Sequence, residues 1–114
     1  LSLVQGGRLK LIAVTSQQRL PTRPDLQTVA ESGFPGFDAL AWNGIFAPAG
    51  TPADVVNRLN ADINAAMAEP AFRQSMVKQG LIVGGGTAAS FKTFIDSETR
   101  KWGAIITKTG IKLD

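Results

Sequence analysis

The chain has 114 residues, of which 44% are apolar and 18% are charged. This balance is typical of one globular domain and excludes both a disordered chain and a membrane-spanning one. Lysine and arginine number 12 against 9 acidic residues, but the basic residues are scattered singly along the sequence. Because nucleic-acid binding needs a concentrated basic stripe, we expect a solvated basic surface and no nucleic-acid partner.

Two residue types on which many enzymes depend are missing, since the chain contains no cysteine and no histidine. It therefore offers no thiol nucleophile, no imidazole base and no thiolate or imidazole ligand for zinc. No serine lies in a GxSxG elbow, and five carboxylates fall on predicted helices without a shared partner, namely Asp54, Asp62, Glu69, Asp96 and Glu98. We therefore expect no catalytic residue, no metal site, no cofactor and no enzymatic activity.

The beginning of the chain predicts half of an α/β unit. Residues 1–5 are typical of the last turn of a helix, because two glycines follow them. Residues 9–14 are short and apolar and predict a largely buried strand, and residues 27–32 predict a short helix that Gly33 stops. The first residues include neither an initiator methionine nor a basic leader, so we expect a chain that was processed, truncated or excised from a longer protein.

Residues 37–48 are the longest extended candidate. Their apolar side chains follow a mixed pattern, and Gly44 is typical of a bulge or of a close backbone approach. We expect this segment to be a strand, and residues 81–83 to be a further short one.

Three helices are predicted in the remainder of the chain. The first begins at residues 51–54, where we expect Thr51 to cap the helix and Asp54 to favour its positive end. Pro70 interrupts this helix and opens a second one, which Gly80 ends.

The third helix follows three consecutive glycines, residues 84–86, and has Thr87 as its expected cap. A phosphate-binding loop would need a lysine before the threonine, so we interpret the glycines as a plain turn. The helix covers roughly 20 residues and ends at Gly110. Its apolar stripe is expected to be buried, with Trp102 in the core, and consists of Phe91, Phe94, Ile95, Trp102, Ile105 and Ile106.

Four residues are candidates for ligand binding. Thr15 and Ser16 follow the predicted strand 9–14, and open α/β sheets bind ligands at the carboxyl ends of their strands. Trp42 and Asn43 lie in the middle of the segment 37–48. The alternatives stay open: ordinary hydroxyls at a strand end, and a tryptophan that belongs to the core.

The order and spacing of several segments resemble one known family over essentially the whole chain. They are GRLKLIAVTS at 7–16, PDLQTVAESGFPGF at 24–37, WNG at 42–44 and APAGTP at 47–52. Single matching residues follow at Leu59, Asn60, Pro70, Gly80, Phe91, Glu98, Trp102, Gly110 and Ile111. The family is that of the Bug-type solute-binding receptors of tripartite tricarboxylate transporters.

The resemblance implies the C-terminal part of a periplasmic, two-lobed receptor that captures a small carboxylate and delivers it to membrane transporter subunits. It implies an α/β, partial periplasmic-binding-protein (Venus-flytrap) fold with short strands and a C-terminal helical part. Residues 1–36 would end the second lobe, 37–50 would form an inter-lobe crossing strand, and 51–114 would return to the first lobe. Thr15, Ser16, Trp42 and Asn43 would then lie near the cleft between the lobes.

Two other interpretations stay open. One is a self-associating structural module that has lost ligand binding, because a lone crossing strand exposes edges that invite pairing with another copy. This interpretation predicts a homo-oligomer, most simply a two-fold dimer. The other is a small acyl-transfer or hydrolytic enzyme, against which the missing nucleophile and base argue.

Overall fold

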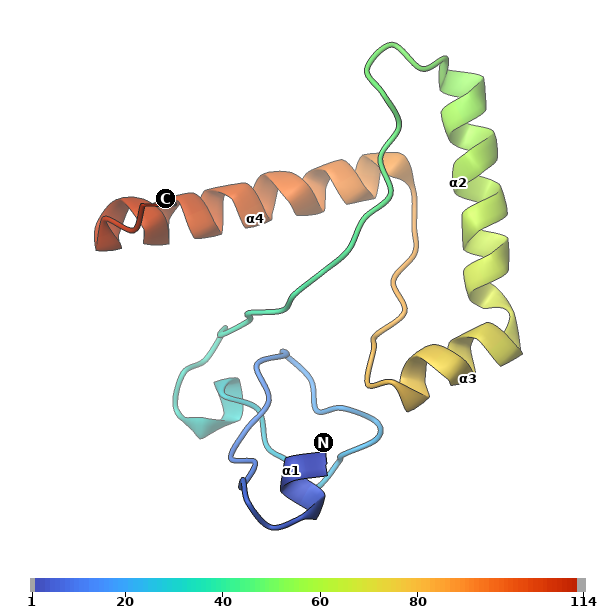
Figure 1. The fold of residues 1–114 in the computed structure, drawn as a ribbon. Coiled ribbons are helices and arrows are strands. Elements are labelled where there is room, and N and C mark those ends of the chain that lie inside the picture. The colour runs from blue at the N-terminus through green and yellow to red at the C-terminus, as the bar shows by residue number, and fades with distance from the viewer. Residues whose placement is uncertain (1, 113–114) are drawn as a thin grey trace. The chain divides into compact units, whose positions relative to one another are not determined.

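The computed structural model describes residues 2–112 and divides into two compact units (Figure 1). The first unit takes in the described residues up to Phe46 together with Gln74–Ile82. The second takes in Ala47–Arg73 together with the described residues from Val83 onward. The helices are α1 (Ser2–Gln5), the 3-10 helix η1 (Ala30–Ser32), α2 (Ala53–Ala68), α3 (Pro70–Lys78) and α4 (Ala88–Thr109).

In the first unit, one parallel bridge joins Val14 to Thr28. The Val14 N–H donates to the Gln27 carbonyl at 3.0 Å, and the Val29 N–H donates to the Val14 carbonyl at 2.9 Å. Thr28 beside the bridge is 1% exposed, and Leu26 is buried near it. This small core holds residues 14 and 28 together although fourteen positions separate them.

The short helix η1 confirms the predicted turn of helix before Gly33, in a form that covers three residues. Thr28 and Glu31 fix its start reciprocally. The Glu31 N–H donates to Thr28 Oγ1 at 3.0 Å, and the Thr28 N–H donates to Glu31 Oε2 at 2.7 Å. This arrangement is a capping box, in which two residues three apart each satisfy the other's backbone amide.

The predicted strands over residues 9–14, 37–48 and 81–83 are wrong for this structure. None of the three is a strand in the described part of the chain, where the pairing is limited to the Val14–Thr28 bridge. Segment 37–48 is tied to the bridge region by the Ala39 N–H, which donates to the Thr15 carbonyl at 3.0 Å. A strand exists only where a neighbour completes its hydrogen-bond ladder, and among these segments of the described chain only Val14 has such a neighbour.

In the second unit, α2 begins at Ala53, within the predicted start at residues 51–54, but Pro52 and not Thr51 is its N-cap residue. The Thr51 hydroxyl donates backwards to the Pro48 carbonyl at 2.8 Å, and no side chain caps the first turn. Asp54 lies in that turn, where a carboxylate favours the positive helix end. Helix α3 begins at Pro70, which confirms the predicted interruption, and the described helices include none long and apolar enough to cross a membrane.

Helix α4 has both of its predicted ends. The Ser90 N–H donates to Thr87 Oγ1 at 3.0 Å, so Thr87 caps the helix. At the other end Gly110 has a φ of +67°, a left-handed conformation that costs glycine least. Helix α4 contacts α2 but its C-terminal half runs away from α2 (Figure 1).

The apolar stripe of α4 is less buried than predicted. Phe91 and Ile95 are half-buried, whereas Trp102 is 38% exposed and Ile106 is 48% exposed. The prediction that Trp102 lies in the core is therefore wrong for this structure. The reason is that α2, the helix in contact with α4, does not extend beside the C-terminal half of the stripe (Figure 1).

Candidate functional site

Thr15 and Ser16 lie on a bend directly after the Val14–Thr28 bridge. Their surroundings differ. Ser16 is 3% exposed and its hydroxyl donates to the Gln18 carbonyl at 2.7 Å. Thr15 is exposed, and its carbonyl accepts the Ala39 N–H. Ser16 therefore fixes the shape of the bend, while Thr15 presents its side chain to the outside.

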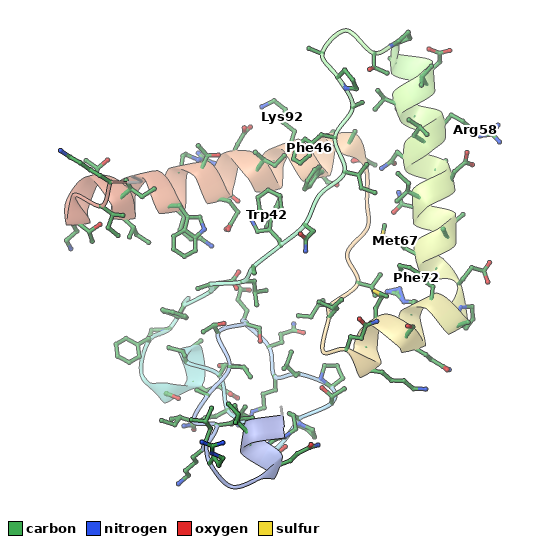
Figure 2. All side chains as sticks on the ribbon, viewed as in Figure 1. Trp42, Phe46, Arg58, Met67, Phe72 and Lys92 are labelled. Carbon is green, nitrogen blue, oxygen red and sulfur yellow. The ribbon has the colours of Figure 1, made fainter. Side chains whose placement is uncertain are left out.

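Trp42 and Asn43 belong to the same compact unit as Thr15 and Ser16. The bond from Ala39 to Thr15 fixes the start of their segment beside the bend, three residues before Trp42. Trp42 projects from the segment and is 39% exposed, and Asn43 is exposed (Figure 2). The four predicted residues thus share one unit, and the structure joins their two segments at Thr15.

A network that the sequence did not reveal supports this unit. Arg19 Nε donates to both carboxylate oxygens of Glu31, at 3.1 and 3.0 Å, and Arg19 Nη1 donates to the Pro24 carbonyl. The hydrogen bond from Arg19, followed by that from the Thr28 N–H, lowers the pKa of Glu31 below its usual value. Arg23 likewise lowers the pKa of Asp25 through a hydrogen bond. These pairs stiffen the loop between the bend and η1.

The glycine turn 84–86 in the second unit has its polar groups occupied. Asn64 Oδ1 accepts the Gly86 N–H at 2.9 Å, and Asn64 Nδ2 donates to the Gly86 carbonyl at 2.9 Å. Asn60 Nδ2 donates to the same carbonyl at 3.0 Å. Because the Gly86 amide is already used, the turn is not a phosphate cradle, in agreement with the absence of a P-loop lysine.

Helix α4 contains a polar cluster that was not predicted as a unit. Glu98 is 8% exposed, and its Oε2 accepts the Trp102 indole N–H at 2.9 Å. Its other oxygen pairs with Lys101, whose ammonium lies 5.2 Å from the Trp102 ring centroid. The spacings of three and four residues are a signal that could have indicated the cluster. Within residues 2–112 no group of His, Cys, Asp and Glu could hold a metal ion.

Two solved structures share this fold over almost the whole chain. An R. palustris protein solved with adipate is 29% identical, with a TM-score of 0.79, and the match covers 96% of this chain and 37% of that one. The periplasmic binding protein BugD is 33% identical, with a TM-score of 0.76, and the match covers 97% of this chain and 38% of that one. The fold is therefore part of a periplasmic binding protein.

Residues 1–111 match the family described as the tripartite tricarboxylate transporter family receptor. The chain belongs to this family. A UPF0065 protein from Pseudomonas sp., encoded in the tcbD–tcbE intergenic region, is 41% identical over 104 residues. That match covers 90% of this chain and 31% of the relative, so the chain spans about a third of the length of such relatives.

Proposed function

We propose that this chain is part of a periplasmic solute receptor that captures a small carboxylate and delivers it to the membrane subunits of a tripartite transporter. The observation that carries the proposal is the family match over residues 1–111. The adipate bound to one structural neighbour supports a carboxylate as the ligand class. A receptor of this kind binds and releases its solute unchanged, so we propose a binding protein and not an enzyme.

We propose Thr15, Ser16, Trp42 and Asn43 as residues of the ligand site. A carboxylate accepts hydrogen bonds only, so its site must supply donors. Thr15 offers an exposed hydroxyl and Asn43 offers the two N–H groups of an exposed amide. The Trp42 ring would cover the methylene groups of a ligand such as adipate. Ser16 would act by holding the bend, because its proton is given to the Gln18 carbonyl.

The proposed lobe assignment is that residues 1–36 end the second lobe, 37–50 cross between lobes, and 51–114 return to the first lobe. Residues 1–36 and the start of the crossing segment belong to one compact unit of the structure. In this proposal the bend at Thr15 and the side chains of Trp42 and Asn43 would lie beside the cleft, where neutral donors meet the ligand.

The test is calorimetric titration of adipate into the chain and into a chimaera. In the chimaera, residues 1–114 replace the aligned residues of the adipate-bound R. palustris protein. Hexane-1,6-diol is the control ligand, because it keeps the methylene chain and lacks the carboxylates. We expect both proteins to bind adipate saturably and neither to bind the diol. In the chimaera, Asn43→Ala and Thr15→Val should weaken adipate binding, whereas Gln17→Ala should leave adipate binding unchanged. Absence of dicarboxylate binding in both proteins would contradict the proposal.

A further inference from the structure

Glu31 holds a backbone amide that is closed off from solvent. Its Oε2 accepts the Thr28 N–H at 2.7 Å, and Thr28 is 1% exposed. A buried amide that loses its acceptor cannot turn to water instead, so this bond is costly to break. The Ser32 hydroxyl donates to the Thr28 carbonyl at 2.8 Å. Both polar groups of the Thr28 backbone therefore depend on side chains of η1.

The same carboxylate fixes the loop that follows the bend at Thr15 and Ser16. Arg19 Nε donates to Glu31 Oε1 at 3.1 Å and to Oε2 at 3.0 Å, and Arg19 Nη1 donates to the Pro24 carbonyl at 3.0 Å. The Arg19 and Glu31 side chains are 44% and 45% exposed. An ion pair this exposed adds little free energy by itself. Its effect is geometric, because it sets where the oxygen that accepts the Thr28 amide lies.

Backbone hydrogen bonds lead from Thr28 to the proposed ligand residues. The carbonyl before Thr28 accepts the Val14 N–H at 3.0 Å, and the amide after Thr28 donates to the Val14 carbonyl at 2.9 Å. Val14 directly precedes Thr15, whose carbonyl accepts the Ala39 N–H at 3.0 Å. Glu31 is thus linked to the bend and, through Thr15, to the start of the segment 37–48, by bonds of ordinary length.

We propose that Glu31 is a positioning residue of the ligand site, which touches no solute and acts through Thr28 on the bend at Thr15. The proposal rests on the proposed function, because it takes the bend as part of the site. A ligand held by a few neutral donors is sensitive to where they lie, since hydrogen bonds weaken steeply away from their best distance and angle. Displacement of the bend therefore weakens carboxylate binding without removing a donor.

Amide hydrogen exchange of the 114-residue chain tests the link without any ligand. Glu31→Gln removes the carboxylate charge, and Asp25→Asn makes the same change in a second carboxylate of this region, which pairs with Arg23 at 2.9 Å. We expect Glu31→Gln to speed exchange of the Ala39 amide at least about tenfold, because release of Thr28 opens the bridge. Asp25→Asn should change the same rate by less than about twofold.

Adipate titration of the chimaera described above measures the effect on the site. Glu31→Gln should raise the dissociation constant for adipate at least about threefold, because the donors are displaced. The matched variant Asp25→Asn should leave that constant within about 1.5-fold of the unmodified chimaera. Circular dichroism of each variant checks that it is folded.

Arg19→Gln is a second variant, which keeps the Glu31 carboxylate and its bond to Thr28. Arg19 is the charged group that acts on Glu31, and its hydrogen bond is the main reason why the pKa of Glu31 lies below its usual value. As the pH is lowered, adipate affinity should therefore begin to fall at a higher pH in Arg19→Gln than in the unmodified chimaera. Arg23→Gln, which acts on Asp25 instead, should follow the unmodified chimaera. The titration of adipate itself is common to all three proteins and cancels in the comparison.

Three results would overturn the proposal. One is an Ala39 exchange rate that Glu31→Gln and Asp25→Asn change equally. Another is an adipate affinity that Glu31→Gln leaves unchanged. The third is the same pH profile of adipate affinity in Arg19→Gln and Arg23→Gln. Absence of adipate binding by the unmodified chimaera would instead contradict the proposed function, and the two failures are distinguishable because exchange at Ala39 involves no ligand.

Discussion

At the scale of single residues, Asn64 makes more hydrogen bonds than any other uncharged side chain described in the second unit. Its Nδ2 donates to the Asn60 and Gly86 carbonyls, and its Oδ1 accepts the Gly86 N–H. One amide group thus holds both polar atoms of Gly86. A Cβ on Gly86, whose φ is +116°, would lie 2.8 Å from Ser90 Oγ, so the turn also depends on glycine at this position.

We expect Asn64→Ala to release the glycine turn. The change removes three hydrogen bonds, each with a net contribution of about 0.5–1.5 kcal/mol, and restores little through the helix propensity of alanine. Hydrogen exchange of the Gly86 amide is the direct measurement and should become much faster. Asn57→Ala, an exposed position on the same helix, is the control. Equal exchange rates in the two variants would show that Asn64 does not hold the turn.

A second residue-scale prediction concerns Glu31. Because its pKa is lowered in the folded chain, Glu31 contributes stability that is fully present above the usual glutamate pKa of about 4.3 and is lost as the pH falls through the lowered value. We expect Arg19→Gln to raise the Glu31 pKa towards the usual value. Carbon-13 titration of the side-chain carboxyl measures this. Arg23→Gln should raise the pKa of Asp25 instead and leave the pKa of Glu31 unchanged. An equal effect of both variants on the Glu31 pKa would show that Arg19 is not the residue that lowers it.

At the scale of elements, two threonines that occupy similar positions before a helix form different hydrogen bonds. Thr87 and Thr51 each precede a helix, but only Thr87 accepts a backbone N–H of that helix, whereas the Thr51 hydroxyl donates to Pro48. We expect Thr87→Ala to cost about 1 kcal/mol of unfolding free energy and Thr51→Ala less than half as much. Urea unfolding followed by helical circular dichroism compares them. A larger loss from Thr51→Ala would contradict the capping assignment.

The same contrast explains which elements the sequence could predict. Prolines, glycines and the apolar period are local signals, and they placed α2, α3 and α4 close to their observed bounds. The strands failed because apolar character does not supply a neighbouring strand, and in residues 2–112 only Val14 found one. Thr15 and Ser16 were chosen for the end of a strand, and the structure places them on a bend after a single bridge. The Asn64–Gly86 contact spans 22 positions, so no local pattern could indicate it.

At the scale of the whole molecule, the exposed apolar surface should be visible in the heat capacity of unfolding. An ordinary domain of 114 residues has a ΔCp of about 1.4–1.7 kcal/mol/K, because unfolding exposes its buried apolar area. Little of that area is buried in this chain, so we expect scanning calorimetry of the chain by itself to give a ΔCp clearly below this range. A value within the ordinary range for the isolated chain would show that the apolar side chains are buried in solution.

The contact between Asn64 and Gly86 also has a consequence for the order of folding. Helices α2 and α4 form from neighbouring residues, which takes on the order of a microsecond, and the loop between residues 64 and 86 is short enough to close on a comparable timescale. The second unit therefore consists of fast, short-range events that require no other chain. Strand pairing for residues 9–13 and 37–48 would have to form at long range, which is slow. We expect α4 to be formed early, before any such long-range pairing.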